Sequence, residues 1–173
     1  KDQNGKTRYS IYNKDGTPAY PTTFEQIRQY SEEITSASDT KGILILSTNK
    51  NGGWQFSNRA WNFGATLQKK DANGKWVATL DDDKAVETLE WIQERKQNDY
   101  LVKETSVNYN DWSDSIGQKV ARAFVGSDVI KLATTTGQVD KDDIAFVPMP
   151  KGPSGQQYSL FGGTPFVVSS DAT

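Results

Sequence analysis

The sequence of 173 residues contains no cysteine and no histidine. These absences exclude zinc sites built from cysteine and histidine, and they exclude Ser-His-Asp and Cys-His catalytic centres within this chain. Disulfides are excluded as well, although the lack of cysteine says little about the redox compartment. No apolar run approaches the roughly 20 residues that a membrane-spanning helix needs.

An excess of charge of either sign is also missing. The chain carries 20 lysines and arginines against 22 aspartates and glutamates, for a net charge of -2, and its basic residues are dispersed. Nucleic acid and an anionic membrane surface are therefore both disfavoured as partners. The length suits one domain. The chain starts at Lys1 without an initiator methionine or a signal peptide, so we expect a processed or trimmed piece.

Apolar spacing and helix-start signals predict four helices. Thr22 and Glu25 match a capping box, with Thr22 as the N-cap. One of three consecutive aspartates is expected to cap a later helix. The helices are expected over residues 24–34, 55–67 and 112–124, and from the aspartates at 81–83 to about Gln97.

The continuous apolar run Gly42–Ser47 predicts a strand buried on both faces. Shorter strands are expected over residues 75–79, 129–132, 144–147 and 166–169. Turns or loops are expected over residues 13–16, 49–53, 71–74 and 151–155. Because strands alternate with helices throughout, the fold class is α/β.

No segment carries a recognisable catalytic or metal-binding pattern. The turn at Asp71–Gly74 begins like a calcium loop but lacks the glutamate at the twelfth position. The Gly-rich stretch Lys151–Gly155 does not match a phosphate-binding loop. Neighbouring carboxylates are numerous, but no pair is singled out by its context as a glycosidase pair. We therefore expect no catalytic residue, no metal and no cofactor.

Several short motifs occur in a family-like order over about residues 20–170: Tyr20–Ile27, Trp61–Gly64, Asp71–Lys75, Leu80–Leu89, Ala123–Ala133, Phe146–Pro153 and Gly162–Ser169. Together they resemble the second lobe of the family 1 extracellular solute-binding proteins of ABC transporters. The resemblance implies a periplasmic-binding-protein-like (type II) lobe, with a mixed sheet flanked by helices. Residues 1–173 would form a single domain, most of the C-terminal lobe of a two-lobed protein, with the first lobe absent.

In that family the ligand lies in a cleft between the lobes, and the resemblance implies which residues face it. They are Trp54, Gln55, Tyr109, Trp112, Gly162, Gly163 and Thr164. A tryptophan after two glycines at a helix start can offer its face to sugar C–H groups, and glycines let backbone N–H groups approach a ligand. The alternatives are that Trp54 caps the core, that Trp112 belongs to a core stripe, and that the glycines form an ordinary turn. Where many sugar-binding members carry a further tryptophan, this chain has Thr134–Gly137.

The function implied by the resemblance is that of the substrate-binding component of an ABC importer. It would bind a carbohydrate by hinge closure and deliver it to the membrane subunits of the permease. We expect a monomer outside the cytoplasm, either periplasmic or lipid-anchored. Three alternatives stay open. A receptor for a peptide or other polar solute would be favoured by a charged residue of the pocket, for example Arg59 pointing into it. A glycoside hydrolase fragment would need two carboxylates roughly 5–9.5 Å apart in a cleft, and a structural or sensory module would have its cleft packed shut by Trp54 and Tyr109.

Overall fold

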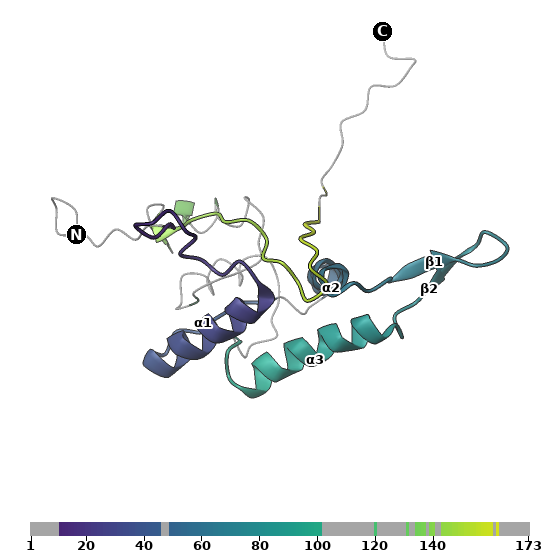
Figure 1. Cartoon of the computed structure of the whole chain (residues 1–173), viewed down its shortest axis with the longest axis horizontal. Helices are drawn as coiled ribbons and strands as arrows, with labels where there is room; N and C mark the ends of the chain where they lie inside the picture. The colour runs from purple at the N-terminus through teal and green to yellow at the C-terminus, as the bar shows by residue number, and fades with distance from the viewer. Residues whose placement is uncertain are drawn as a thin grey trace, which may run out of the picture.

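The computed structural model describes residues 11–45, 49–101, 143–160 and 162, together with residues 120, 131, 134–137, 139 and 140. The elements in chain order are α1 (Phe24–Ala37), α2 (Asn49–Phe63), β1 (Gln68–Lys70), β2 (Trp76–Ala78) and α3 (Asp83–Gln97). In Figure 1 the β1–β2 hairpin extends away from the three helices. None of the helices among the described residues is long and apolar enough to cross a membrane.

Helix α1 begins at Phe24, as predicted, and continues to Ala37 beyond the predicted end at residue 34, but its N-cap is one residue later than expected. The hydroxyl of Thr23 accepts a hydrogen bond from the Gln26 N–H at 3.1 Å, and Thr23 is the N-cap. Thr22 lies outside the helix because its carbonyl accepts from the Lys151 N–H at 2.8 Å. The prediction of Thr22 as N-cap, paired with Glu25, is therefore wrong. A threonine followed three residues later by a Glu or Gln also occurs one position further on, at Thr23 and Gln26. The side-chain oxygen of Gln26 accepts a hydrogen bond from the Thr22 N–H at 2.7 Å.

Helix α2 is displaced towards the N-terminus relative to the prediction of residues 55–67. Asn49–Gly53, expected to be a loop, is helical, which shows that two adjacent glycines are tolerated in its first turns. The helix ends at Phe63 because Gly64 adopts a left-handed conformation with φ of 94°. The Ala65 N–H then donates to the Ala60 carbonyl at 2.8 Å, and the Gly64 N–H to the Trp61 carbonyl at 3.0 Å. This is the Schellman pattern of a glycine-terminated helix.

The turn, hairpin and third helix follow their predicted signals more closely. The Asp71 carboxylate accepts from the Asn73 and Lys75 N–H groups, both at 2.9 Å, so the predicted turn is confirmed. It joins β1 to β2 in an antiparallel pair. The α3 helix is capped by Asp82 and ends at Gln97, as expected. Strand β1 was not predicted, because its Gln-Lys-Lys sequence is exposed throughout and has no apolar alternation.

The described part of the apolar run, residues 42–45, is largely buried. Ile43 and Leu44 are 0% and 4% exposed. Ile43 forms a parallel bridge to Leu101, and Lys41 forms another to Val120. The run and the residue before it thus have two parallel partners. Over its described residues these pairings are isolated bridges rather than a continuous ladder.

Two further strand predictions are contradicted where the structure describes them. Lys131, Thr134 and Thr135 are helical, so a strand over 129–132 is wrong at Lys131. The hydroxyls of both threonines donate to the Lys131 carbonyl, at 3.0 and 2.8 Å, and stabilise this turn locally. Residues 144–147 belong to no strand, and Phe146 is 60% exposed. The predicted helix over 112–124 is wrong at Val120, which forms a bridge to Lys41 instead. The other residues of that helix and the strand over 166–169 lie outside the described residues.

The hydrophobic core joins one aromatic side chain from each helix. Phe24 of α1 lies 5.8 Å from Phe63 of α2 and 5.3 Å from Trp91 of α3, measured between ring centroids. Ile27, Ile43 and Leu101 complete this buried cluster. Because Phe63 is the last residue of α2, the core fixes the C-terminal end of that helix. The opposite end of α2 carries the candidate site.

Candidate functional site

Trp54 lies near the start of α2 and is 47% exposed, outside the hydrophobic core. Its six-membered ring lies against Gly162. A Cβ atom placed on Gly162 would be 2.9 Å from Cζ3 and 3.4 Å from Cζ2 of the indole, and closer still to Cη2. The structure therefore brings together two of the expected ligand-binding positions, which are more than a hundred residues apart in the sequence. Their contact with a ligand stays a prediction.

Gln55, the neighbour of Trp54, is directed into the protein and is only 5% exposed. One guanidinium nitrogen of Arg59, Nη1, donates to the Gln55 carbonyl at 2.7 Å and to its side-chain oxygen at 3.0 Å. Arg59 is completely buried, and burial lowers its pKa from 12.5 to about 9. Arg59 is thus enclosed beside its own helix, and the two side chains support the start of α2 from within.

Two asparagines of α2 hold the chain segment that leads to Gly162. The fully buried Asn62 side chain donates from Nδ2 to the Tyr158 carbonyl at 2.9 Å and accepts the Tyr158 N–H on Oδ1 at 2.8 Å. Asn58 donates to the same carbonyl at 3.1 Å. Neither asparagine was identified from the sequence. The available signal was their spacing, since Trp54, Asn58 and Asn62 recur every four residues along one side of the helix.

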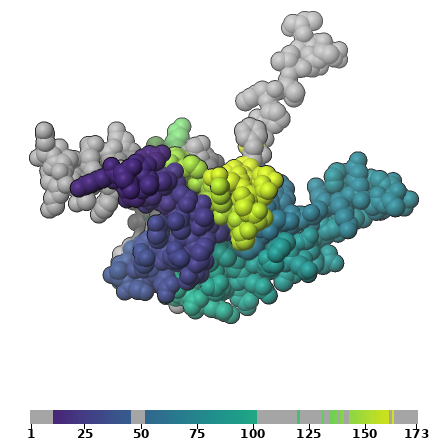
Figure 2. All heavy atoms as spheres, in the orientation of Figure 1, coloured from purple at the N-terminus to yellow at the C-terminus, as the bar shows by residue number. Residues whose placement is uncertain are grey.

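The Pro-Gly loop at residues 151–155 is a loop, as predicted, and it docks on the other end of α2. The Ser154 hydroxyl donates to the Asn62 carbonyl at 2.8 Å. Gly152 approaches the same peptide so closely that a Cβ atom there would lie 2.5 Å from the Asn62 carbonyl carbon. The Lys151 backbone pairs with the chain at the start of α1. In Figure 1 the segment runs from the start of α1 to α2, and in Figure 2 its yellow atoms lie against the body of the molecule.

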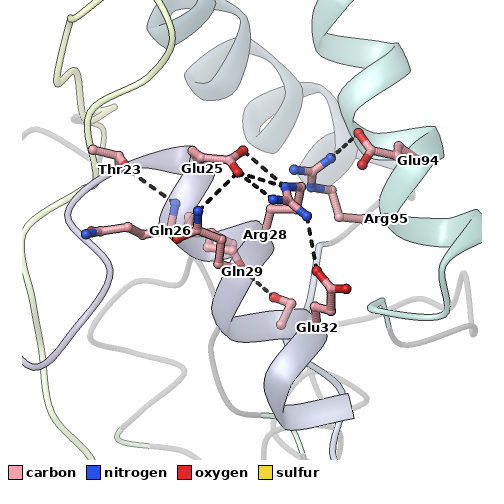
Figure 3. Close-up of polar contacts among 10 residues, drawn as sticks. Thr23, Glu25, Gln26, Arg28, Gln29, Glu32, Glu94 and Arg95 are labelled. Atoms are coloured by element: carbon pink, nitrogen blue, oxygen red, sulfur yellow. Dashed lines mark hydrogen bonds and ion pairs between the residues drawn. The ribbon is translucent and has the colours of Figure 1, made fainter. Parts of the chain in front are cut away.

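Charged side chains also form ion pairs within α1 and within α3. Arg28 contacts Glu25 at 2.6 Å and Glu32 at 3.1 Å, while Arg95 contacts Glu94 at 2.7 Å (Figure 3). Arg95 is 1% exposed, and its guanidinium carbon lies 4.1 Å from the ring centroid of the core residue Trp91. Burial lowers the pKa of Arg95. Because Arg95 packs on a core ring and the other pairs lie within one helix, we interpret these charges as structural.

The remaining expected site residues are not described. Tyr109, Trp112, Gly163 and Thr164 lie outside the described residues. Within the described part of the chain, no group of three or more acidic side chains is placed to hold a metal ion. Asp82, from the aspartate run at 81–83, accepts the Lys84 N–H at 2.8 Å as a helix cap.

Two solved structures share this fold. The GacH receptor of Streptomyces glaucescens GLA.O, solved unliganded and with acarbose, superposes with a TM-score of 0.66 at 20% identity, over 79% of this chain and 34% of its own. Maltose-bound MalE3 of T. maritima superposes with a TM-score of 0.65 at 16% identity, over 83% of this chain and 37% of its own.

These likenesses establish a periplasmic-binding-protein-like fold and confirm, at the level of the fold, the resemblance to extracellular solute-binding proteins. The chain spans about a third of the length of either structure. Searches of protein-family models and of curated protein sequences give no match.

Proposed function

We propose that this chain is the second lobe of a two-lobed, non-catalytic substrate receptor, and that it forms one wall of a carbohydrate-binding cleft. The observation that carries the proposal is the contact between half-exposed Trp54 and Gly162. An indole held by a glycine backbone on one side and open to solvent elsewhere suits stacking against the apolar C–H groups of a sugar ring. The backbone at Gly162 offers polar groups beside it, which a sugar hydroxyl can approach.

The ligands of the two structural neighbours support the carbohydrate class. One was solved with acarbose and the other with maltose, and both compounds are built from linked sugar-like rings. Arg59 is enclosed and held by Gln55, so it does not present a charge beside Trp54 for an anionic or peptide ligand. A neutral, polar ligand with apolar ring faces is the chemistry that the described side chains favour.

The role in transport follows from the same proposal. The receptor would close its two lobes around the sugar by a hinge movement and dock on the membrane subunits of an ABC permease. It would act outside the cytoplasm, as a periplasmic or lipid-anchored monomer. No cofactor or metal takes part in this mechanism.

The proposal is tested by a tryptophan-fluorescence titration of the two-lobed receptor with maltose, maltotriose and short peptides. We expect a saturable change with at least one sugar, and a dissociation constant about tenfold higher in Trp54→Ala, since about 1.4 kcal/mol of stacking energy corresponds to a factor of ten. Trp76→Ala is the matched control, because Trp76 is 59% exposed on the β1–β2 hairpin. It should leave sugar binding unchanged.

Two results would contradict the proposal. A saturable response to peptides alone would retain the receptor fold and overturn the carbohydrate class. An equal rise in the dissociation constant for the sugar in Trp54→Ala and Trp76→Ala would show that neither side chain acts through direct contact with the ligand. Trp54 would then not belong to the binding wall. Calorimetric titration of the same variants checks that changes in fluorescence report binding rather than the loss of an indole.

A further inference from the structure

We infer that Asn62 and Asn58 are positioning residues for the ligand wall, because they fix the segment that seats Gly162 against Trp54. The inference rests on the proposed function for its consequence in binding, but the contact itself can be tested without a ligand. The asparagines lie on α2, whereas the segment comes from the far end of the chain, 96 residues beyond Asn62 at Tyr158.

Both the donor and the acceptor ends of the Asn62 side-chain amide are engaged. Its Oδ1 accepts the Tyr158 N–H, and its Nδ2 donates both to the Tyr158 carbonyl and, at 2.7 Å, to the Asn58 carbonyl. An amide has two N–H donors, so both are used here. The side chain is 0% exposed, and removing it would leave the Tyr158 N–H without this acceptor at a partly buried position. The Tyr158 peptide is therefore held in one orientation.

The segment runs antiparallel to α2, and three contacts along the helix show this direction. Ser154 lies at the C-terminal end of the helix, where its Cβ atom would be 3.3 Å from a Cβ on Gly64. Tyr158 is bonded in the middle, by Asn58 and Asn62. Gly162 lies at Trp54, near the start of the helix.

The number of residues between Tyr158 and Gly162 agrees with this antiparallel arrangement. From the level of Asn62 to that of Trp54 the helix rises about 12 Å, at 1.5 Å per residue. The four residues that follow Tyr158 can extend over roughly 13–14 Å. Tyr158 is bonded by both Asn62 and Asn58, which lie about 12 and 6 Å along the helix from Trp54, so these four residues are long enough to place Gly162 at the indole. Freeing the Tyr158 peptide would allow the segment to lift, and would remove the surface that restricts the Trp54 ring.

This positioning has a consequence for binding. A ligand that stacks on a restrained indole does not have to order it, whereas a ligand that meets a mobile one does. The asparagines would therefore raise affinity without touching the sugar. This role differs from a merely structural one, which would change the stability of the fold and leave the surroundings of Trp54 as they are.

The test uses the two-lobed receptor without ligand. The emission of Trp54 is isolated by subtracting the spectrum of Trp54→Phe, in the wild type and in each variant background. Asn62→Leu removes both halves of the clamp at similar side-chain volume, and Asn58→Ala removes a single donor. We expect a red-shifted Trp54 emission and stronger acrylamide quenching in both variants, larger in Asn62→Leu. Asn98→Ala is the control, since its side chain donates to the Glu94 carbonyl at the end of α3.

Binding is then measured by calorimetry with maltose as the probe. Loss of the clamp should raise the dissociation constant by roughly threefold to tenfold, the cost of ordering one large side chain. Unchanged Trp54 emission and quenching in both variants, with native circular dichroism, would overturn the inference even if their unfolding midpoints fall. If Asn62→Leu does not fold, Asn58→Ala decides the question. A wild type that ignores maltose while binding peptides contradicts the carbohydrate proposal, and the emission experiment still decides the clamp.

Discussion

At the residue scale, a glycine among the described residues allows close packing of a neighbouring helix backbone. Gly42 lies against Ser31 of α1, and a Cβ atom on Gly42 would be 2.5 Å from the Ser31 Cα. Ser31 is buried, and its hydroxyl donates back to the Ile27 carbonyl at 2.6 Å. Two small residues thus allow the apolar run at 42–45 to pack directly on the helix, next to the core residue Ile43.

Gly42→Ala should therefore destabilise the fold. The added methyl group meets both the side chain and the Cα of Ser31, so either α1 or the apolar run must move. Overpacking of this kind costs about 1–3 kcal/mol. Urea denaturation followed by circular dichroism gives the change in the free energy of unfolding.

Gly53→Ala is the matched control for this prediction. Gly53 lies within α2, and a Cβ atom there would meet nothing within 4 Å. Alanine stabilises a helix relative to glycine by roughly 0.5–1 kcal/mol, so this variant should be at least as stable as the wild type. Equal stability of both variants would mean that Ser31 yields easily and that the close packing is not needed.

Some residues of the candidate site can be singled out from the sequence, and others cannot. Trp54 and Gly162 could be predicted, because a tryptophan after paired glycines and a Gly-Gly turn are distinctive and match a family pattern. Asn58 and Asn62 could not, because an asparagine within a helix carries no local signal of its partner. Their partner, Tyr158, lies 96 to 100 residues away, so only the folded chain shows the clamp.

At the scale of the element, local chemistry determined which predictions hold. The α3 cap and the Asp71 turn are formed by side chains that bond within four residues, and both were predicted correctly. The end of α2 was misplaced because apolar spacing continues to Leu67, while the left-handed Gly64 ends the helix first. The α1 cap was misplaced by one residue because Thr22 and Thr23 both fit the local pattern. The bond from Lys151 to the Thr22 carbonyl decides between them.

Helix α1 should also show a measurable dependence of its stability on pH through Glu25. Hydrogen bonds from Arg28 lower the pKa of Glu25 below its usual 4.5. A carboxylate with a lowered folded-state pKa stabilises the protein above the unfolded value, and that contribution is lost as the pH falls through the folded value. Glu25→Gln should lower the free energy of unfolding at pH 7 by no more than about 0.5 kcal/mol, because the Glu25 side chain is 58% exposed.

The difference between wild type and Glu25→Gln should be complete above pH 4.5 and should shrink as the pH falls below it, in thermal or urea unfolding measured from pH 3 to 7. Glu33→Gln is the control on the same helix. Glu25 lies in the first turn, where the helix dipole favours negative charge, whereas Glu33 lies towards the other end. A constant difference at all pH values would show that Glu25 acts through packing rather than through its charge.

At the scale of the whole molecule, the alternation of helices with apolar runs was enough to predict the α/β class. The pairing of those runs was not, because it joins distant parts of the chain. Ile43 pairs with Leu101, and Thr23 pairs with Lys151. Residues 144–147 have strand-like composition, yet they form no sheet, and Phe146 stays exposed. Composition predicts which segments are apolar, but a segment becomes a strand only where another segment of the chain lies beside it and pairs with its backbone.

The arrangement of the candidate site as a single wall predicts how tightly the isolated chain binds a sugar. The described part of the candidate site is one surface, with Trp54 half exposed, whereas small-molecule sites normally enclose 70–90% of the ligand surface. A single wall leaves much of a sugar in water and cannot close over it. The isolated chain should therefore bind maltose roughly a hundredfold or more weaker than the two-lobed receptor, a difference of about 2.7 kcal/mol.

Calorimetric titration of both proteins measures this ratio, with circular dichroism to establish that the isolated chain retains its helices. The Trp54→Ala substitution then separates two explanations of any residual binding. If the lobe binds weakly through the same wall, the substitution abolishes what remains. If the isolated chain binds as tightly as the whole receptor, the ligand lies within this lobe, and closure of a cleft between two lobes is not the mechanism.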